Sequence, residues 1–317
     1  MKVFPRPLLQ LVFLLVPLLS GAQPEVFTRS DFELRGPVRT STVITDYGEE
    51  RFEFDPGGKL LKTLTRYSDA DYDITYYRYS EGVLTERRDE VYRDGSFDKS
   101  SSFARFYQRD SLSATLTETI TSYDEQMKEQ VTFTYDSIGR VEHMVRIGPE
   151  GIDETRVAFS EEQGEETAEY FLNGQLSKSV RRSESDGAEG STVTILVKEY
   201  IQGLPQKALE QTRNSKDHLL LETQFVYDSV KSGFRKEQTR VFTYGEDGLL
   251  ETETISYLNS KGRVSRIEEK KYLYQKDGKT PGNWIRKVIT PENTIIARRI
   301  AYFEEIPTQA ADSIPRN

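Results

Sequence analysis

A short pattern that returns along the chain constrains its fold more than any other feature. The pattern is aromatic–any–aromatic, then a polar turn that contains glycine, then a β-branched residue or leucine. It reads FTYDSIGRV at 133–141 and FTYGEDGLL at 242–250. In the first half the aromatic starts are 25, 29, 27 and 26 residues apart, at Phe52, Tyr77, Phe106, Phe133 and Phe159. This near-constant period predicts a repeat architecture in which each unit packs on its neighbours.

One unit reads as a β-hairpin. Val131, Phe133 and Tyr135 alternate with polar residues, so a strand places all three on one face. Residues 136–139 (DSIG) supply the turn, because Asp hydrogen-bonds the backbone ahead of it and Gly accepts positive φ. The alternation resumes in the return strand at 141–147.

The repeats predict an all-β fold, an antiparallel β-hairpin array of about a dozen to twenty strands. The face opposite the bulky residues carries Thr, Glu, Arg and Lys and is expected to be wet, which antiparallel sheets tolerate. The array is expected to curve into an open sheet or a partial barrel or shell. Residues 161–172 and 204–212 are candidates for short helices. Residues 182–191 favour a long hairpin tip, with a boundary between two sub-arrays as the alternative.

Composition excludes several classes of function. The 317-residue chain has no cysteine, which excludes disulfides and a thiol nucleophile. It carries 43 Lys and Arg against 52 Asp and Glu, a net charge of -9, which argues against a nucleic-acid partner. Hydrophobic residues make up 36%, which argues against a thick, fully buried core.

The first 22 residues are typical of a secretory signal peptide. Lys2 and Arg6 precede a twelve-residue apolar run at 8–19, and the small residues at 20–22 place the cut before Gln23. A bilayer span takes about 20 residues, so this run is too short. Cleavage removes two basic residues and takes the net charge from -9 to -11.

The remaining chain divides into a short lead, one repeat domain and a tail. The lead is 23–31, the β-repeat domain is 32–305, and 306–317 reads as a disordered tail. No later stretch approaches membrane length, so no membrane span is expected after cleavage. We expect an exported protein that is periplasmic, outer-membrane-associated or extracellular.

The FTYDSIGRV segment and its cousins resemble the YD repeat of the RHS family. In that repeat a Tyr-Asp pair, two residues, a Gly and a β-branched residue mark each hairpin. Tyr135-Asp136 and Tyr227-Asp228 keep the literal pair, and the resemblance spans about 32–305. It implies an extended β-strand array, which in large RHS proteins closes into a shell holding a toxin. This chain has no toxin-like tail. Some YD-repeat proteins are linked with carbohydrate or partner binding.

The sequence supports no catalytic or cofactor-binding residue. His143 and His218 lack any metalloprotease spacing and read as ordinary sheet and turn residues. Asp69, Asp71 and Asp73 alternate as in the start of an EF-type calcium loop. The glycine and the bidentate glutamate of such a loop are both missing, so a solvated turn is the favoured interpretation and weak calcium binding the alternative.

Seven aromatic residues are candidates for a ligand surface that stacks on a sugar or a peptide. The competing interpretation is cross-strand packing, which stabilises neighbouring strands by roughly 0.2–1 kcal/mol per pair. The candidates are Tyr72, Tyr76, Tyr77, Tyr79, Tyr272, Tyr274 and Trp284.

We therefore expect a secreted, non-catalytic binding or structural module at the periplasm or cell surface, with a protein or glycan partner. The alternative is a carbohydrate-binding or carbohydrate-active protein that uses aromatic and acidic residues in a groove. A third interpretation is an exposed terminal strand that pairs with another chain. The oligomeric state is left open.

Overall fold

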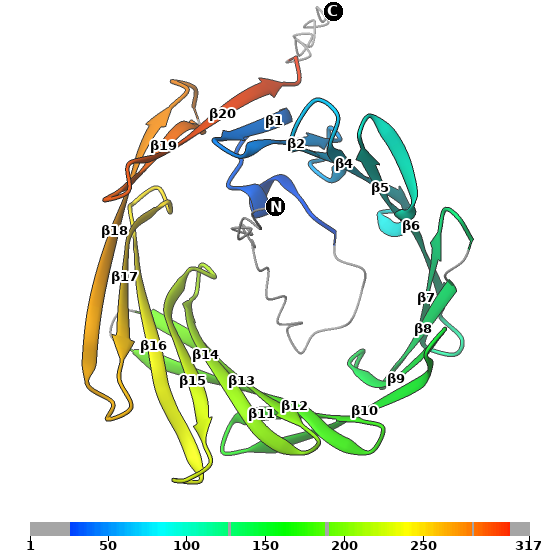
Figure 1. Ribbon diagram of the computed structural model, residues 1–317, viewed down its shortest axis with the longest axis vertical. Helices are drawn as coiled ribbons and strands as arrows, with labels where there is room; N and C mark the ends of the chain where they lie inside the picture. The colour runs from blue at the N-terminus through cyan, green and yellow to red at the C-terminus, as the bar shows by residue number, and fades with distance from the viewer. Residues whose placement is uncertain (1–25, 126–127, 188–189, 281, 305–317) are drawn as a thin grey trace, which may run out of the picture.

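A computed structural model describes residues 26–125, 128–187, 190–280 and 282–304. The signal and tail predicted at 1–22 and 306–317 lie outside these residues. The described chain forms the 3-10 helix η1 (Arg29–Phe32) and a ring of strands (Figure 1). The strands are β1 (Val38–Thr45), β2 (Gly48–Phe54), β3 (Leu60–Arg66), β4 (Tyr72–Ser80), β5 (Val83–Arg93), β6 (Ser96–Asp110), β7 (Thr115–Ser122), β8 (Lys128–Tyr135), β9 (Val141–Gly148), β10 (Gly151–Glu162), β11 (Glu165–Leu172), β12 (Gln175–Gly187), β13 (Gly190–Ile201), β14 (Leu204–Asn214), β15 (Leu219–Asp228), β16 (Gly233–Tyr244), β17 (Leu250–Leu258), β18 (Val264–Lys276), β19 (Trp284–Thr290) and β20 (Thr294–Tyr302).

The strands form one closed antiparallel β-barrel. Each strand pairs with the next along the chain, and β20 returns to pair with β1, so that Ile300 lies opposite Ser41. Closure leaves neither terminal strand with an unpaired edge. The predicted all-β array of antiparallel hairpins is confirmed, and the sheet is closed rather than open (Figure 1).

The polar turns have the predicted chemistry. The Asp136 carboxylate accepts hydrogen bonds from the backbone N–H of Ile138 at 3.0 Å and of Arg140 at 2.8 Å. Gly139 has φ +86°, a left-handed conformation that residues with a Cβ rarely adopt. Asn259 repeats this arrangement, accepting from the N–H groups two and four residues ahead at 2.9 and 3.1 Å. The repeat is therefore a recurring turn geometry as well as a sequence pattern.

Both candidate helices are strands. Residues 161–172 fall in β10 and β11, and 204–212 lie in β14. Their backbone groups pair with neighbouring strands on both sides, and this pairing overrides the weak local helix propensity. Residues 182–187 lie in β12 and 190–191 in β13, and the two strands pair with each other, which confirms the favoured hairpin. The described residues of this segment are paired strand rather than a loop.

The N-terminal segment 26–37 identifies the inner wall, because it lies inside the ring (Figure 1). Its Phe27 ring packs 6.2 Å from Tyr77, and its Phe32 ring 4.5 Å from Phe52. Residues opposite each other on paired strands share a face, so this assignment extends from strand to strand. By this register Val131 and its bulky neighbours point inward, and the Thr-rich and charged positions between them point outward.

The apolar core is thin, as the composition predicted. The larger cluster of buried residues lies where the N-terminal segment meets the inner wall, and a second, smaller one lies on β12 and β13. The buried members are Leu34, Val38, Phe54, Leu60, Tyr77 and Leu84 in the first cluster and Val180, Ile195 and Val197 in the second. No helix among the described residues has the length and apolar character needed to cross a membrane.

Candidate functional site

The inner wall carries a hydrogen-bonded network of charges centred on Arg240. Its guanidinium contacts Glu222 on β15 at 3.0 Å and Glu253 on β17 at 2.7 Å. Glu222 also accepts a hydrogen bond from Gln211 at 2.8 Å, and Glu253 accepts one from the Tyr272 hydroxyl at 2.7 Å. Both carboxylates are buried, and burial raises the pKa of Tyr272, with the hydrogen bond to Glu253 adding to the shift.

A second inner network crosses β4, β5, β6 and β7. Asp89 accepts hydrogen bonds from Arg87 at 2.9 Å and from the Thr75 hydroxyl at 2.9 Å. Arg105 lies 3.6 Å from Asp89 and 3.2 Å from Glu118. Two arginines and two carboxylates make up this network, so its charges are balanced and its members orient one another.

Other inward charges are open to solvent. Arg146 pairs with Glu129 at 2.7 Å, yet 58% of its side chain is exposed. Arg266 on β18 is 61% exposed. Barrels of 16 or more strands are wide enough to enclose water. The inner wall therefore combines polar networks with surface that water or a ligand can reach.

A small pocket lies where β10 ends and β11 begins. It has a volume of about 230 Å³ and is lined by Arg140, Phe159, Ser160, Glu161, Glu166 and Thr167. Glu161 and Glu166 stand opposite each other in the register, and the Arg140 guanidinium lies 3.8 Å from the Phe159 ring centroid. Two like-charged carboxylates thus share one pocket with a cation and an aromatic ring.

The seven candidate aromatic residues do not form one surface. Tyr72 and Tyr76 are on the outer wall, where Tyr72 stacks on Tyr92 with ring centroids 4.5 Å apart. The Tyr92 and Tyr123 hydroxyls both donate to Glu90, each at 3.2 Å. The face of Tyr72 that meets Tyr92 is therefore used for cross-strand packing.

The other five candidates are on the inner wall in separate groups. Tyr77 and Tyr79 border the core around the N-terminal segment, and the Tyr79 hydroxyl donates to the Leu60 carbonyl at 2.8 Å. Tyr272 belongs to the Arg240 network. Tyr274 lies 6.2 Å from Trp284, which is only 2% exposed and donates from Nε1 to Glu33 at 2.8 Å. Trp284 thus serves an internal contact.

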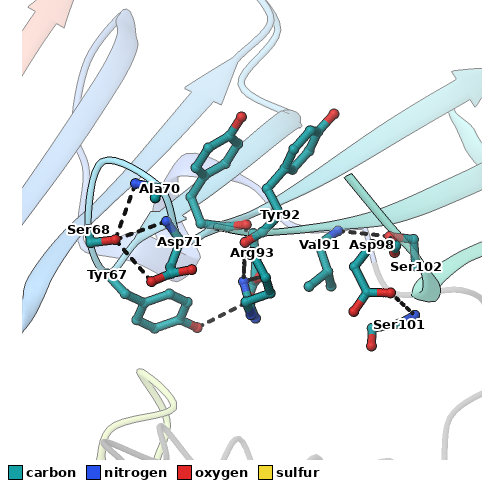
Figure 2. Close-up of polar contacts among 12 residues, drawn as sticks. Tyr67, Ser68, Ala70, Asp71, Val91, Tyr92, Arg93, Asp98, Ser101 and Ser102 are labelled. Carbon is teal, nitrogen blue, oxygen red and sulfur yellow. Dashed lines mark hydrogen bonds and ion pairs between the residues drawn. The ribbon is translucent and has the colours of Figure 1, made fainter. Parts of the chain in front are cut away.

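The three aspartates of the calcium candidate bind different partners. Asp69 is fully exposed. Asp71 accepts from Ser68 Oγ at 3.1 Å (Figure 2). It also accepts from the N–H of Asp94 at 3.0 Å. Asp73 pairs with Arg93 at 2.7 Å. Among the described residues no three potential metal ligands come together. The contacts of Asp71 with Asp94 and of Asp73 with Arg93 join two neighbouring hairpins.

The two histidines make separate contacts. His143 on the outer wall lies 2.8 Å from Glu154, and His218 stacks on Tyr244 with ring centroids 4.3 Å apart. Contacts of this kind are ordinary for a histidine in a sheet or a turn, which is what the sequence predicts for both residues.

The outer wall carries cross-strand ion pairs. Examples are Arg78–Glu86 at 3.0 Å, Arg299–Glu49 at 3.3 Å and Arg181–Glu165 at 3.1 Å, which lie on different parts of the ring. Exposed apolar side chains such as Ile147 and Ile152 also occur on this wall.

Sequence reasoning missed the charged members of the inner wall. The missed residues are Glu222, Arg240 and Glu253, which share the inward face of their strands with bulky residues. A charge at an inward position indicates that the wall is not simply apolar. Glu33 and Asn283 carry no local signal, since their partners are about 250 residues away.

Comparisons with known proteins give limited similarity. No family model matches the chain, and no curated protein matches it. Among solved structures it is similar to a porin-like protein from Bacteroides uniformis, with 8% identity, a TM-score of 0.34, and 84% of this chain and 99% of that chain covered. A porin-like protein from Bacteroides vulgatus has 11% identity and a TM-score of 0.24, with 84% of this chain and 98% of that chain covered. The TcdB2-TccC3 structure has 14% identity and a TM-score of 0.27, with 72% of this chain and 15% of that chain covered. Membership of the RHS family stays a prediction.

Proposed function

We propose that this chain is an exported, non-catalytic binding module of the cell envelope, a barrel with water on both walls that takes its partner at the inner wall. The observation that carries this proposal is the charged outer wall. It supports a role in solution at the cell envelope, with a protein or glycan as partner.

The outer wall is unsuited to lipid. A barrel that spans a bilayer presents an apolar band about 25 Å tall to the acyl chains. Here ion pairs such as Arg78–Glu86 and Arg181–Glu165 stand on that wall. An Arg or Lys facing lipid near the midplane costs about 2–4 kcal/mol. Since several such residues are spread around the ring, water is the better solvent for this surface.

The inner wall has what a binding site needs. Solvent-exposed Arg146 and Arg266 stand among buried networks that hold the wall in shape. Aromatic and guanidinium groups are the side chains most enriched at binding hot spots. Apart from Glu161 and Glu166 in the small pocket, the acids and histidines described above are engaged in ion pairs, hydrogen bonds or ring contacts, which favours recognition over catalysis.

Flotation with liposomes tests the solvent of the outer wall. The mature chain, residues 23–317, is mixed with liposomes of bacterial phospholipids without detergent and centrifuged through a density gradient. We expect the protein to stay at the bottom as a folded, β-rich species. Co-flotation that survives a high-salt wash would contradict the proposal.

A glycan array tests the inner wall with two matched variants on β18. Arg266 points inward and is 61% exposed, and Lys271 points outward and is 62% exposed. We expect a bound glycan to be lost with Arg266→Ala and retained with Lys271→Ala. Equal retention by both variants would place binding elsewhere, and an empty array would remove the glycan as partner.

The pocket between β10 and β11 favours a second candidate, a carbohydrate-active protein. Glu161 and Glu166 face each other there beside Phe159, and a glycosidase uses two carboxyl groups flanking the scissile bond. Release of nitrophenol from a panel of nitrophenyl glycosides, abolished by Glu161→Gln or Glu166→Gln, would support it. No turnover by the wild-type protein would eliminate it.

A further inference from the structure

Two cations flank the buried ring of Trp284 on the inner wall. The Arg298 guanidinium carbon lies 3.5 Å from the ring centroid, and Lys287 Nζ lies 4.9 Å from it. Trp284 is 2% exposed and Arg298 7% exposed. Attraction to the ring stabilises each cation by about 2 kcal/mol, which is less than the several kcal/mol that burying a charge costs.

Arg298 lacks the partners that a buried guanidinium needs. Its Nη2 donates to the Phe32 carbonyl at 3.2 Å, whereas Nε and Nη1 are buried and have no hydrogen-bond partner among the described residues. Burial lowers the pKa of Arg298 to about 10 and also lowers that of Lys287. Unused donors beside a second cation are an arrangement that binds an anion.

Glu33 is the acidic residue that contacts Trp284 in this arrangement. Its carboxylate accepts from Trp284 Nε1 at 2.8 Å and partly offsets the lowering of the pKa that burial causes at Lys287 and Arg298, although neither cation forms an ion pair with it within 4.0 Å in the described chain. Glu33 has φ +55°, an uncommon conformation for a residue with a side chain. It belongs to the segment that lies inside the barrel, so it approaches from the side that a ligand in the lumen would use.

We propose that Trp284, Lys287 and Arg298 form a binding site for a dicarboxylate on the inner wall, and that Glu33 is the internal group with which this ligand competes. The inference deepens the proposed binding function, on which it rests, by naming a site and a ligand class.

Displacing Glu33 leaves the two positive charges of Lys287 and Arg298, so the charge balance selects a dianion. Lys287 and Arg298 bring two positive charges, and Glu33 returns one negative charge. A ligand with two carboxylates neutralises both cations, and one of its oxygens reaches the Trp284 N–H that Glu33 now holds. Its second carboxylate supplies acceptors for Nε and Nη1 of Arg298, since a guanidinium and a carboxylate match in a two-bond geometry.

Fluorescence reports on this site directly, because Trp284 is the single tryptophan of the chain. The mature protein is titrated with succinate in a carboxylate-free buffer while tryptophan is excited selectively. We compare wild type with Glu33→Ala, which removes the competitor and leaves space for one carboxylate. We expect the variant to bind succinate at least about tenfold more tightly than wild type. Lys287→Met in the Glu33→Ala background should weaken that binding by about tenfold.

Two further variants separate binding from folding. Glu33→Gln keeps the volume and an acceptor for Trp284 while removing the charge, so it answers the question if Glu33→Ala does not fold. Asp31→Ala is the matched control, since Asp31 lies in the same segment and bonds Thr28 instead. Its affinity should equal that of wild type.

The proposal is overturned if neither Glu33 variant gives a saturable signal, or if Lys287→Met leaves succinate binding unchanged. Tighter binding of sulfate than of succinate would overturn the dicarboxylate as ligand. Flotation does not depend on this site, so its result separates failure of this inference from failure of the proposed barrel function.

Discussion

The side-chain amide of Asn283 holds the backbone of Arg35 at both ends. Its Oδ1 accepts from the Arg35 N–H at 2.7 Å, and its Nδ2 donates to the Arg35 carbonyl at 2.9 Å. Nδ2 also donates to the Tyr302 hydroxyl at 2.8 Å, and Asn283 is 1% exposed. One side chain thus joins the segment inside the barrel to the start of β19 and the end of β20.

Replacing this amide tests how much the internal segment stabilises the barrel. Asn283→Ala leaves the N–H and carbonyl of Arg35 without these partners, and a buried polar group without a partner costs about 1–3 kcal/mol. We expect urea denaturation to show a loss of about 3 kcal/mol in unfolding free energy. Asn283→Asp keeps the acceptor for the Arg35 N–H, but it buries a charge and sets a second oxygen against the Arg35 carbonyl, so it should give a loss at least as large. Equal stability of all three proteins would mean that the contact is not maintained in solution.

Gly139 tests the turn of the clearest repeat. Its φ of +86° places a β-branched residue in a strained conformation, although nothing lies within 4 Å of an added Cβ. We expect Gly139→Val to lower the unfolding free energy by about 1–2 kcal/mol from backbone strain alone. Gly139→Asn should be milder, because Asn tolerates this conformation. A melting temperature that is the same for Val and Asn would contradict the strain argument.

Arg240 tests the larger inner network. Arg240→Met leaves the buried carboxylates of Glu222 and Glu253 without their shared cation, and breaking such a pair costs about 3–5 kcal/mol. Arg286→Met is the control, since Arg286 is exposed on β19. Adding Glu222→Gln and Glu253→Gln to Arg240→Met should recover part of the loss. If the triple variant is less stable than Arg240→Met, the unpaired charge of the two buried carboxylates is not the cause.

The raised pKa of Tyr79 leads us to expect that the folded protein loses stability at high pH. Burial raises the pKa of Tyr79 to about 12, and its hydroxyl donates to the Leu60 carbonyl. The unfolded chain releases this proton near its ordinary value of about 10, so stability should fall as the pH rises from about 10 to about 12.

Phenylalanine removes the ionisable group and separates the two effects. Tyr79→Phe should be less stable than wild type near neutrality by about 1 kcal/mol, because the hydrogen bond is lost. It should lose less stability than wild type between pH 10 and 12. Tyr47→Phe is the control at an exposed turn, where Tyr47 is 73% exposed. Parallel pH curves for wild type and Tyr79→Phe would contradict the assignment.

The seven aromatic candidates show where local reasoning about the site stopped. Alternation correctly separates Tyr76 from Tyr77, which point to opposite walls. It does not say which wall faces the lumen, or that Trp284 would be covered by Arg298 and bonded to Glu33. Such contacts join residues that are distant in sequence, and the periodicity of a strand does not predict which distant residues come together.

The sequence by itself determined the hairpins. Period-two alternation assigns each side chain to a face, and turns such as Asp136–Gly139 reverse the chain with a geometry that few other residues adopt. Only the tertiary structure decided that β20 meets β1, and that residues 26–37 lie inside the ring. Local pairing is the same in an open and in a closed sheet. Closure depends on the twist and stagger accumulated over every strand, and this sum is a property of the whole barrel.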